Sequence, residues 1–279
     1  MGLGRSSYYD RRTVLEKRDA KAIEQLRAVH DEHPFYGVER LALHLHWSQG
    51  KTRRTRNLAG LVIPTATKKN KYSRGKKPEI EAPDNALKPF AVFKDPDRPQ
   101  DGLDYSGMVN ADAWVQDFTY MKFQGTYCYL AVVLCIKTRR VLGWRLGTNH
   151  SSELTYSAFL DALSKYSPPA ILHSDQGSEY LSYKHQLLCQ RMEIILSCSD
   201  KASPWQNGFM ERWFGNFKLE LKPLSQLKDL SELHETIALQ IHYYNTKRIH
   251  SVLKTNPSDY AKSLEEQKVI RNVSEKVRG

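Results

Sequence analysis

Three acidic residues stand in surroundings that suit metal chemistry better than a plain surface. Asp117 interrupts an apolar segment, Asp175 directly follows another, and 35 residues separate Asp175 from Glu211, which lies in a segment with helical periodicity. An unpaired carboxylate is costly beside apolar strands. Two strands and a helix can bring three carboxylates around a pair of divalent cations, which activates an attacking oxygen and stabilises a leaving oxygen in phosphoryl transfer. We therefore expect all three acids to be metal ligands.

The donor atoms of this set are all oxygens. Such a set suits Mg²⁺, so the expected cofactor is a pair of Mg²⁺ ions, with Mn²⁺ as a substitute, and zinc is a poor candidate. The alternative is that the three acids are helix caps or surface charges, because the chain has 31 acidic residues in all. His173, two residues before Asp175, is expected either to hydrogen-bond a carboxylate or phosphate or to be a buried structural histidine. Lys218 follows Glu211 by seven residues, which places both on one helical face.

The elements that must position these acids follow from hydrophobic periodicity and turn signals. Three strands separated by short polar breaks predict an antiparallel meander, and a β-α-β-α succession follows it. This order predicts an α/β fold, a ribonuclease-H-like mixed five-stranded sheet with flanking helices, in which the fourth strand pairs with the first and Asp117 and Asp175 converge. Ser151 or Ser152 is the expected cap of the first helix in this part. The predicted strands are 113–120, 127–137, 141–147, 170–174 and 193–197, and the predicted helices are 152–166, 182–192, 204–221 and 231–244.

The first 64 residues predict a small helical domain. Helices are expected at 13–32, 38–47 and 51–61, and a tight turn at 48–50 separates the last two. The third carries Lys51, Arg53, Arg54 and Arg56, which is typical of a helix-turn-helix whose second helix enters the major groove of DNA. The alternative is a helical bundle with a solvated basic face. A basic, Pro-rich linker is expected at 65–109, the catalytic core at 110–262, and a charged, frayed tail at 263–279.

Charge is unevenly distributed along the chain. The net charge is +11, and residues 1–100 hold 21 Lys and Arg against 12 Asp and Glu, whereas residues 101–279 hold 21 against 19. A basic front on a nearly neutral body predicts an arm that binds a polyanion, because neutralised phosphates release counterions. Lysines that are merely solvated are the alternative. Lys68, Lys69 and Lys71 of the linker are included among the expected DNA contacts, as are Arg212 and Lys222 beside the acids.

Several other classes of protein are not supported by the composition. No apolar run approaches the roughly 18 residues of a membrane helix, and the first residues lack the pattern of a secretory signal. We therefore expect a soluble, cytoplasmic protein with no membrane partner, associated with the nucleoid when it is bound to DNA. The four cysteines show no C-x-x-C pairing and are expected to be small buried hydrophobes.

Five sequence motifs carry a resemblance to a known protein family, and the resemblance covers about residues 5–262. They resemble the downstream-frame transposases of the IS-three family of bacterial insertion sequences, whose DDE core is similar to that of retroviral integrases. The resemblance implies that Asp117, Asp175 and Glu211 are the catalytic acids and that Lys218 contacts the DNA end. The motifs are His33-Pro-Phe-Tyr-Gly-Val-Glu-Arg-Leu41, Trp114-Val-Gln-Asp117-Phe-Thr-Tyr120, His173-Ser-Asp-Gln-Gly-Ser-Glu-Tyr180, Ser203-Pro-Trp-Gln-Asn-Gly-Phe-Met-Glu211 and Tyr243-Tyr-Asn-Thr-Lys-Arg-Ile-His250.

The function that this resemblance implies is metal-dependent cleavage at element ends and strand transfer of a 3′-hydroxyl into target DNA. The implied partners are double-stranded DNA of the element ends and target, further copies of the chain in a homo-multimer, and an upstream-frame DNA-binding protein. The chain departs from the family pattern at Arg212-Trp213, where smaller residues are common, so different packing is expected there. The alternatives are a nuclease of the ribonuclease-H kind, which would cut without joining, and a non-catalytic DNA-binding protein derived from a transposase.

Overall fold

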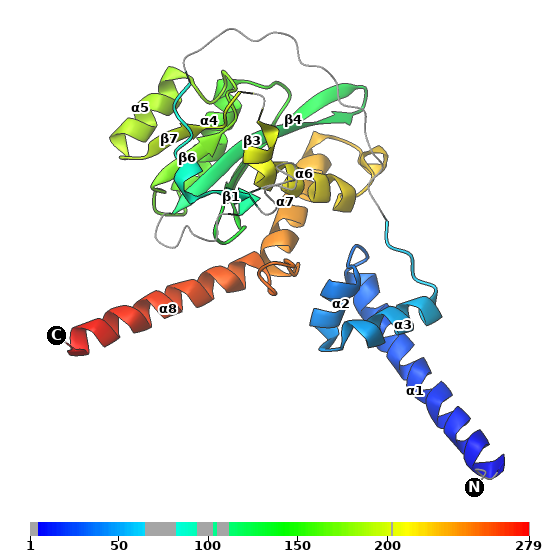
Figure 1. The fold of residues 1–279 in the computed structure, drawn as a ribbon. Helices are drawn as coiled ribbons and strands as arrows, with labels where there is room; N and C mark the ends of the chain where they lie inside the picture. The colour runs from blue at the N-terminus through cyan, green and yellow to red at the C-terminus, as the bar shows by residue number, and fades with distance from the viewer. Residues whose placement is uncertain (1–4, 65–81, 94–102, 105–111, 202, 279) are drawn as a thin grey trace.

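The computed structural model describes residues 5–64, 82–93, 103–104, 112–201 and 203–278. A three-helix domain comes first, then a small two-stranded ribbon, then a five-stranded sheet with helices on both faces, and a long helix comes last (Figure 1). The helical domain consists of α1 (Arg5–Glu32), α2 (Val38–Leu45) and α3 (Gln49–Ala59), and the ribbon of β1 (Val92–Phe93) and β2 (Leu103–Asp104) follows the short η1 (Lys88–Phe90). The core contains β3 (Ala113–Phe123), β4 (Thr126–Cys135), β5 (Val141–Gly147), α4 (Ser152–Leu163), β6 (Ile171–Ser174), α5 (Tyr183–Arg191), β7 (Ile195–Cys198), η3 (Pro204–Asn207), α6 (Gly208–Glu220), η4 (Leu224–Gln226), α7 (Leu230–Thr246) and α8 (Pro257–Arg278).

The large sheet has the strand order β5-β4-β3-β6-β7. Strands β3, β4 and β5 are antiparallel neighbours, whereas β6 is parallel to β3 and β7 is parallel to β6. The α/β prediction of a mixed five-stranded, ribonuclease-H-like sheet with flanking helices is therefore confirmed, including the pairing of the fourth strand of this sheet with the first.

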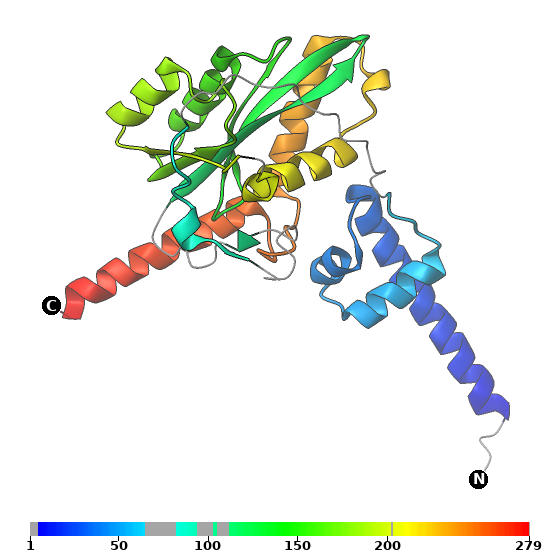
Figure 2. The same cartoon turned by 45° about the horizontal axis from the view of Figure 1, so that its top comes forward.

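Two hydrophobic clusters lie on opposite faces of this sheet. On one face, Val115 and Val132 pack with apolar residues of α6 and α7. On the other face, Trp114 and Val133 pack with apolar residues of α4 and with Cys189 of α5. Side chains alternate along β3 and β4 as the period of two requires. Figure 2 shows α6 and α7 together on one side of the sheet and α4 and α5 on the other.

The three helices predicted for the first part of the chain are present, with shifted boundaries. Helix α2 ends at Leu45 because His46 adopts a left-handed conformation (φ 53°). Ser48 begins α3 as its N-cap and accepts a hydrogen bond from the Lys51 backbone N–H, as short polar side chains do at this position. The turn between the two helices therefore comprises residues 46–48, slightly earlier than expected. Helix α1 starts at Arg5, ahead of the predicted residue 13.

Other expectations have mixed outcomes. Ser151 caps α4 through the Leu154 N–H, and all four cysteines are buried and form no disulfide. The expected frayed tail is wrong, because residues 263–278 belong to α8, which projects from the core in Figure 1. Lys68, Lys69 and Lys71, with most of the expected linker, lie outside the described residues. Within the described part of the chain, no helix has the length and apolar character needed to cross a membrane.

Candidate active site

The pairing of β3 with β6 places two of the expected acids just beyond the paired residues of neighbouring strands. Val115 of β3 and His173 of β6 are the last aligned pair, and Asp117 and Asp175 each follow by two residues, with Asp175 directly after the end of β6. Adjacent strands lie about 4.8 Å apart. The antiparallel partner of Asp117 on its other side is Val132, whose side chain belongs to the α6-facing cluster. Asp117 therefore lies on the face of the sheet that α6 covers.

Backbone N–H groups orient both aspartates. The Phe118 N–H donates to Oδ1 of Asp117 at 2.8 Å, and the Gly177 N–H donates to Oδ1 of Asp175 at 2.9 Å. A Cβ atom at Gly177 would lie 2.8 Å from Oδ1 of Asp175 and 2.6 Å from Oε2 of Glu179, so a larger residue there would make these carboxylates shift. The loop after β6 is thus shaped around the carboxylate. Both aspartates are partly buried.

Helix α6 presents Glu211 and Lys218 on one side. Its buried side chains, Met210, Trp213, Phe214 and Phe217, face the sheet, while Glu211 and Lys218 are exposed. Lys218 Nζ donates to the carbonyl oxygen of Tyr120 at 2.9 Å and lies 5.3 Å from the centre of the Tyr120 ring. The side of α6 that bears Lys218 therefore faces β3 at Tyr120, which follows Asp117 by three residues along that strand.

Hydrogen bonds hold the residues before α6 to the segment that follows β7, an edge strand of the sheet. Gln206 donates from Nε2 to Oδ2 of Asp200 at 2.8 Å and accepts at Oε1 from the Asp200 N–H and from Nδ2 of Asn85. Hydrogen bonds from Lys88 and Gln206 hold the pKa of Asp200 below its usual range. Because Asp200 follows β7, α6 runs from the end of β7 towards β3, with Glu211 in its first turn. Sequence reasoning missed Gln206 and Asn85; their placement in polar stretches before structured elements was the available signal.

The carboxylates do not form a ready-made three-ligand cluster. Among the described residues, no group of three or more His, Cys, Asp and Glu side chains is arranged to hold a metal ion. The donor chemistry of Asp117, Asp175 and Glu211 nevertheless fits a hard divalent cation, because all their ligand atoms are oxygens. Ligation by all three acids therefore stays a prediction.

His173 has a structural role. It is fully buried, with Nδ1 2.9 Å from the hydroxyl of Ser197 and Nε2 3.0 Å from that of Ser199. Burial lowers the pKa of His173 to about 4, an effect that Asp200 partly opposes. Both ring nitrogens are thus committed to β7 and the residue after it. Of the two roles that the sequence left open, the buried structural one is correct.

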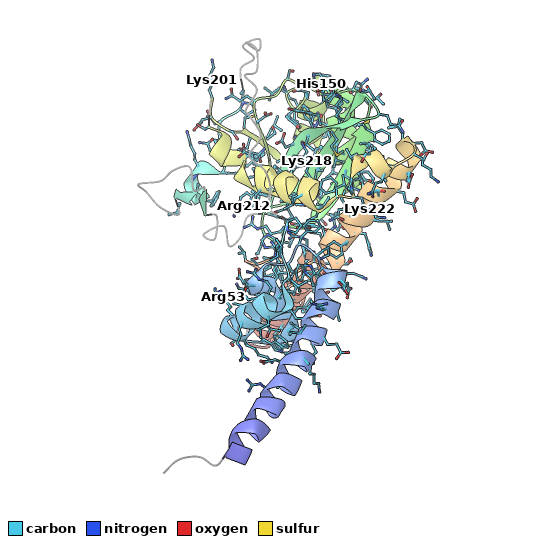
Figure 3. All side chains as sticks on the ribbon, turned by 90° about the vertical axis from the view of Figure 1, so that its right-hand side faces the viewer. Arg53, His150, Lys201, Arg212, Lys218 and Lys222 are labelled. Carbon is cyan, nitrogen blue, oxygen red and sulfur yellow. The ribbon has the colours of Figure 1, made fainter. Side chains whose placement is uncertain are left out.

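The basic residues expected to bind DNA are placed unevenly. Figure 3 shows Arg212, Lys218 and Lys222 around α6, but Arg212 lies about 100° around the helix from Glu211. In α3, Arg53 is exposed, Lys51 lies with Nζ 3.7 Å from the Trp47 ring centre, and Arg54 forms an ion pair with Asp19. Arg56 is different, because its Nε is buried without a hydrogen-bond partner among the described residues. The exposed face of α3 is lined by Gly50, Arg53, Arg54, Asn57 and Leu58.

Comparisons with known proteins agree with this fold. Residues 110–204 match the integrase core domain family, and residues 192–257 match a second family model of the same description. A transposase for insertion sequence element IS904 of Lactococcus lactis is 29% identical over 249 residues, covering 86% of this chain and 92% of the relative. A putative transposase, InsK, for element IS150 of Escherichia coli is 27% identical, covering 92% and 89%. The magnesium-bound HTLV-2 integrase catalytic core is 22% identical with a TM-score of 0.44, covering 53% of this chain and 94% of that structure.

The core of the chain is thus an integrase core with ribonuclease-H-like topology. The matches of both parts of this core, and relatives aligned over most of their length, place the whole chain among the bacterial insertion-sequence transposases.

Proposed function

We propose that this chain catalyses metal-dependent cleavage at the ends of a DNA element and transfer of the resulting 3′-hydroxyl into target DNA. The observation that carries the proposal is the parallel pairing of β3 with β6, because Asp117 and Asp175 each follow the last paired residues by two positions, and α6, the helix that bears Glu211, covers the face on which Asp117 lies. Membership of the insertion-sequence transposases supports the same reaction.

The proposed catalytic residues are Asp117, Asp175 and Glu211, which would hold the metal. A bound pair of Mg²⁺ ions, or Mn²⁺ in their place, would lower the pKa of the attacking hydroxyl and stabilise the leaving oxygen. The protein contributes orientation. The Phe118 and Gly177 N–H groups each hold one oxygen of an aspartate, so the direction of each carboxylate is set before substrate arrives.

Lys218 is the proposed contact with the DNA end. Its contacts with Tyr120 keep the ammonium group beside β3, on the helical side that also bears Glu211. A cation held there attracts the phosphate that follows the cleaved bond. Arg212 and Lys222 are proposed as weaker contacts with the flanking phosphates, because both are exposed at the same helix.

The proposed substrate is double-stranded DNA, and the exposed face of α3 is the proposed second contact with it. Two element ends must be brought together before joining, so we infer a homo-multimer in the DNA complex. An upstream-frame DNA-binding protein is the proposed partner for recognition of the terminal sequence. A protein that acts in this way would be associated with the nucleoid while it is bound to DNA.

A strand-transfer assay with labelled element ends tests the catalytic assignment. Asp117→Asn, Asp175→Asn and Glu211→Gln should each lower the joining rate on the order of a thousandfold or more, because each removes a ligand charge. DNA binding should be retained. Glu235→Gln is the matched control, because Glu235 is an exposed acid on α7, and it should join normally.

The same assay separates the alternatives. Joining should require Mg²⁺ or Mn²⁺ and should stop with a chelator. Cleavage without joining by the unaltered protein would indicate a nuclease of the ribonuclease-H kind. Binding without either reaction would indicate a non-catalytic DNA-binding protein. Full joining by any two of the acid variants would refute the assignment of the acids.

A further inference from the structure

The helical domain and the core meet at residues that stand more than 200 positions apart in the sequence. Tyr36, in the turn before α2, is almost fully buried, and its hydroxyl accepts from the Ile249 N–H at 2.7 Å and donates to the Lys247 carbonyl at 3.4 Å. His33 stacks on Tyr36 at 4.4 Å between ring centres, and its Nδ1 lies 2.7 Å from the hydroxyl of Tyr243. A buried tyrosine hydroxyl with two backbone partners makes a specific contact.

Charged and polar pairs surround this contact. Arg40 of α2 donates to the hydroxyl of Ser251 at 3.3 Å, and Lys254 forms an ion pair with Glu39. Both pairs join α2 to the segment between α7 and α8. Figure 1 shows the helical domain close to the end of α7 from which this segment departs.

The same segment is attached to the catalytic helix. Arg248 is 2% exposed and donates two parallel hydrogen bonds to Glu220, from Nε to Oε2 at 2.7 Å and from Nη2 to Oε1. Glu220 is the last residue of α6. A buried arginine with two bonds to one carboxylate has a fixed geometry. The guanidinium therefore links the helical domain's docking segment to the end of the helix that carries Glu211.

The end of α7 is anchored to the sheet as well. The Tyr244 hydroxyl donates to the Arg139 carbonyl at 2.8 Å, and the side chain of Asn245 bonds the backbone N–H and carbonyl of Val141 at 3.0 and 2.9 Å. Side chains of the motif at 243–250 thus contact the helical domain, the sheet and α6. A segment held at three places in this way has little freedom to bend.

We propose that residues 243–254 form a rigid joint that fixes the helical domain relative to α6, and that Tyr36 and Arg248 are positioning residues for strand transfer. The second part rests on the proposed function. The joint holds the DNA-contacting face of α3 at a constant place relative to Glu211 and Lys218, so that DNA bound by one domain enters the other in register. The docked arrangement is retained during the reaction.

Cross-linking tests the joint directly. Glu39→Cys and Lys254→Cys, introduced together in the full chain, should be joined within one molecule by a short bis-maleimide, because the two native side chains form an ion pair. The four native cysteines are buried and should not react. The cross-linked protein should join element ends at the rate of the untreated double variant. Failure to cross-link, or loss of joining on cross-linking, would overturn the joint.

Tyr36→Phe tests positioning without deleting the ring. It leaves the Ile249 N–H without its partner, which should weaken docking and lower the maximal joining rate about tenfold. The KM for element-end DNA should stay unchanged. Tyr127→Phe is the control, because Tyr127 is an exposed tyrosine at the β3–β4 turn, and it should join normally. A changed KM with an unchanged maximal rate would contradict positioning.

Arg248→Lys complements this test, because a lysine keeps the charge but cannot make two parallel bonds to Glu220. It should show the same loss of maximal rate as Tyr36→Phe. Normal joining by both variants would overturn the positioning role. The cross-linking result in DNA-free protein does not depend on activity, so failure of the joint and failure of the proposed reaction remain distinguishable.

Discussion

Single residues show how this protein keeps polar groups where apolar packing surrounds them. Each aspartate of the candidate site receives a backbone N–H from one or two residues further along the chain, which offsets part of the cost of partial burial. His173 is satisfied by two serine hydroxyls. His185 of α5 is less well satisfied, because Nδ1 lies 3.1 Å from the Ser182 hydroxyl while Nε2 is buried without a partner among the described residues.

His185 should make stability depend on pH. Burial lowers the pKa of His185 to about 4, whereas an unfolded histidine titrates near 6.5. The unfolded state therefore binds the proton first as the pH falls. The stability contribution is fully present above about pH 6.5 and is lost on the way down to about pH 4, by up to about 3 kcal/mol.

His185→Phe removes this titration and preserves a ring that stacks on Phe159. Urea unfolding at pH 7.5 and pH 5 should show a smaller difference in free energy for the variant than for the native chain. An identical difference in both proteins would show that His185 does not titrate as its burial implies.

At the scale of elements, a close approach between α4 and β5 sets the position of this helix on the sheet. Helix α4 lies so near β5 that a Cβ atom at Gly143 would meet the Ala158 carbonyl oxygen at 2.4 Å and the Ala162 nitrogen at 2.5 Å. Both contacts are with backbone atoms, which cannot turn away as a side chain could. Glycine at position 143 therefore determines the distance between α4 and the sheet.

Gly143→Ala should destabilise the core by about 1–3 kcal/mol, because the helix must move away from the strand. Gly215 is the matched control: it is exposed on α6 and nothing lies near the site of an added Cβ. Gly215→Ala should raise stability by about 0.5–1 kcal/mol, as the helix propensities predict. Thermal or urea unfolding measures both changes, and equal effects would exclude the steric explanation.

At the scale of the whole molecule, the excess positive charge and the proposed catalytic acids belong to different parts. The first 100 residues hold most of the net charge, and the helical domain they contain docks on the segment after α7. Deleting this domain would also expose Tyr243 and the backbone of Ile249. Substitution of single exposed cations therefore tests DNA binding more cleanly than truncation.

Arg53→Gln should weaken DNA binding across sequences and lower the slope of log Kobs against log salt by about one for each phosphate that the protein no longer neutralises. Arg53 is suited to this test because it is exposed on α3. Lys184→Gln is the control, because Lys184 is an exposed cation that pairs with Glu153 on the far face of the sheet. An unchanged slope for Arg53→Gln would place the DNA elsewhere.

Local patterns in the sequence were sufficient for the order of elements, the mixed sheet and the positions of Asp117 and Asp175 at or after strands, because alternation, capping and turn residues act over a few positions. Contacts between distant segments were not predictable in this way. The contacts of α2 with the segment after α7, the partners of His173 and the inward Nε of Arg56 each depend on packing that periodicity does not contain. Only the tertiary structure decided the contact of Tyr36 with the motif at 243–250. Two surfaces that are complementary in shape and charge produce no periodic pattern in the sequence of either segment.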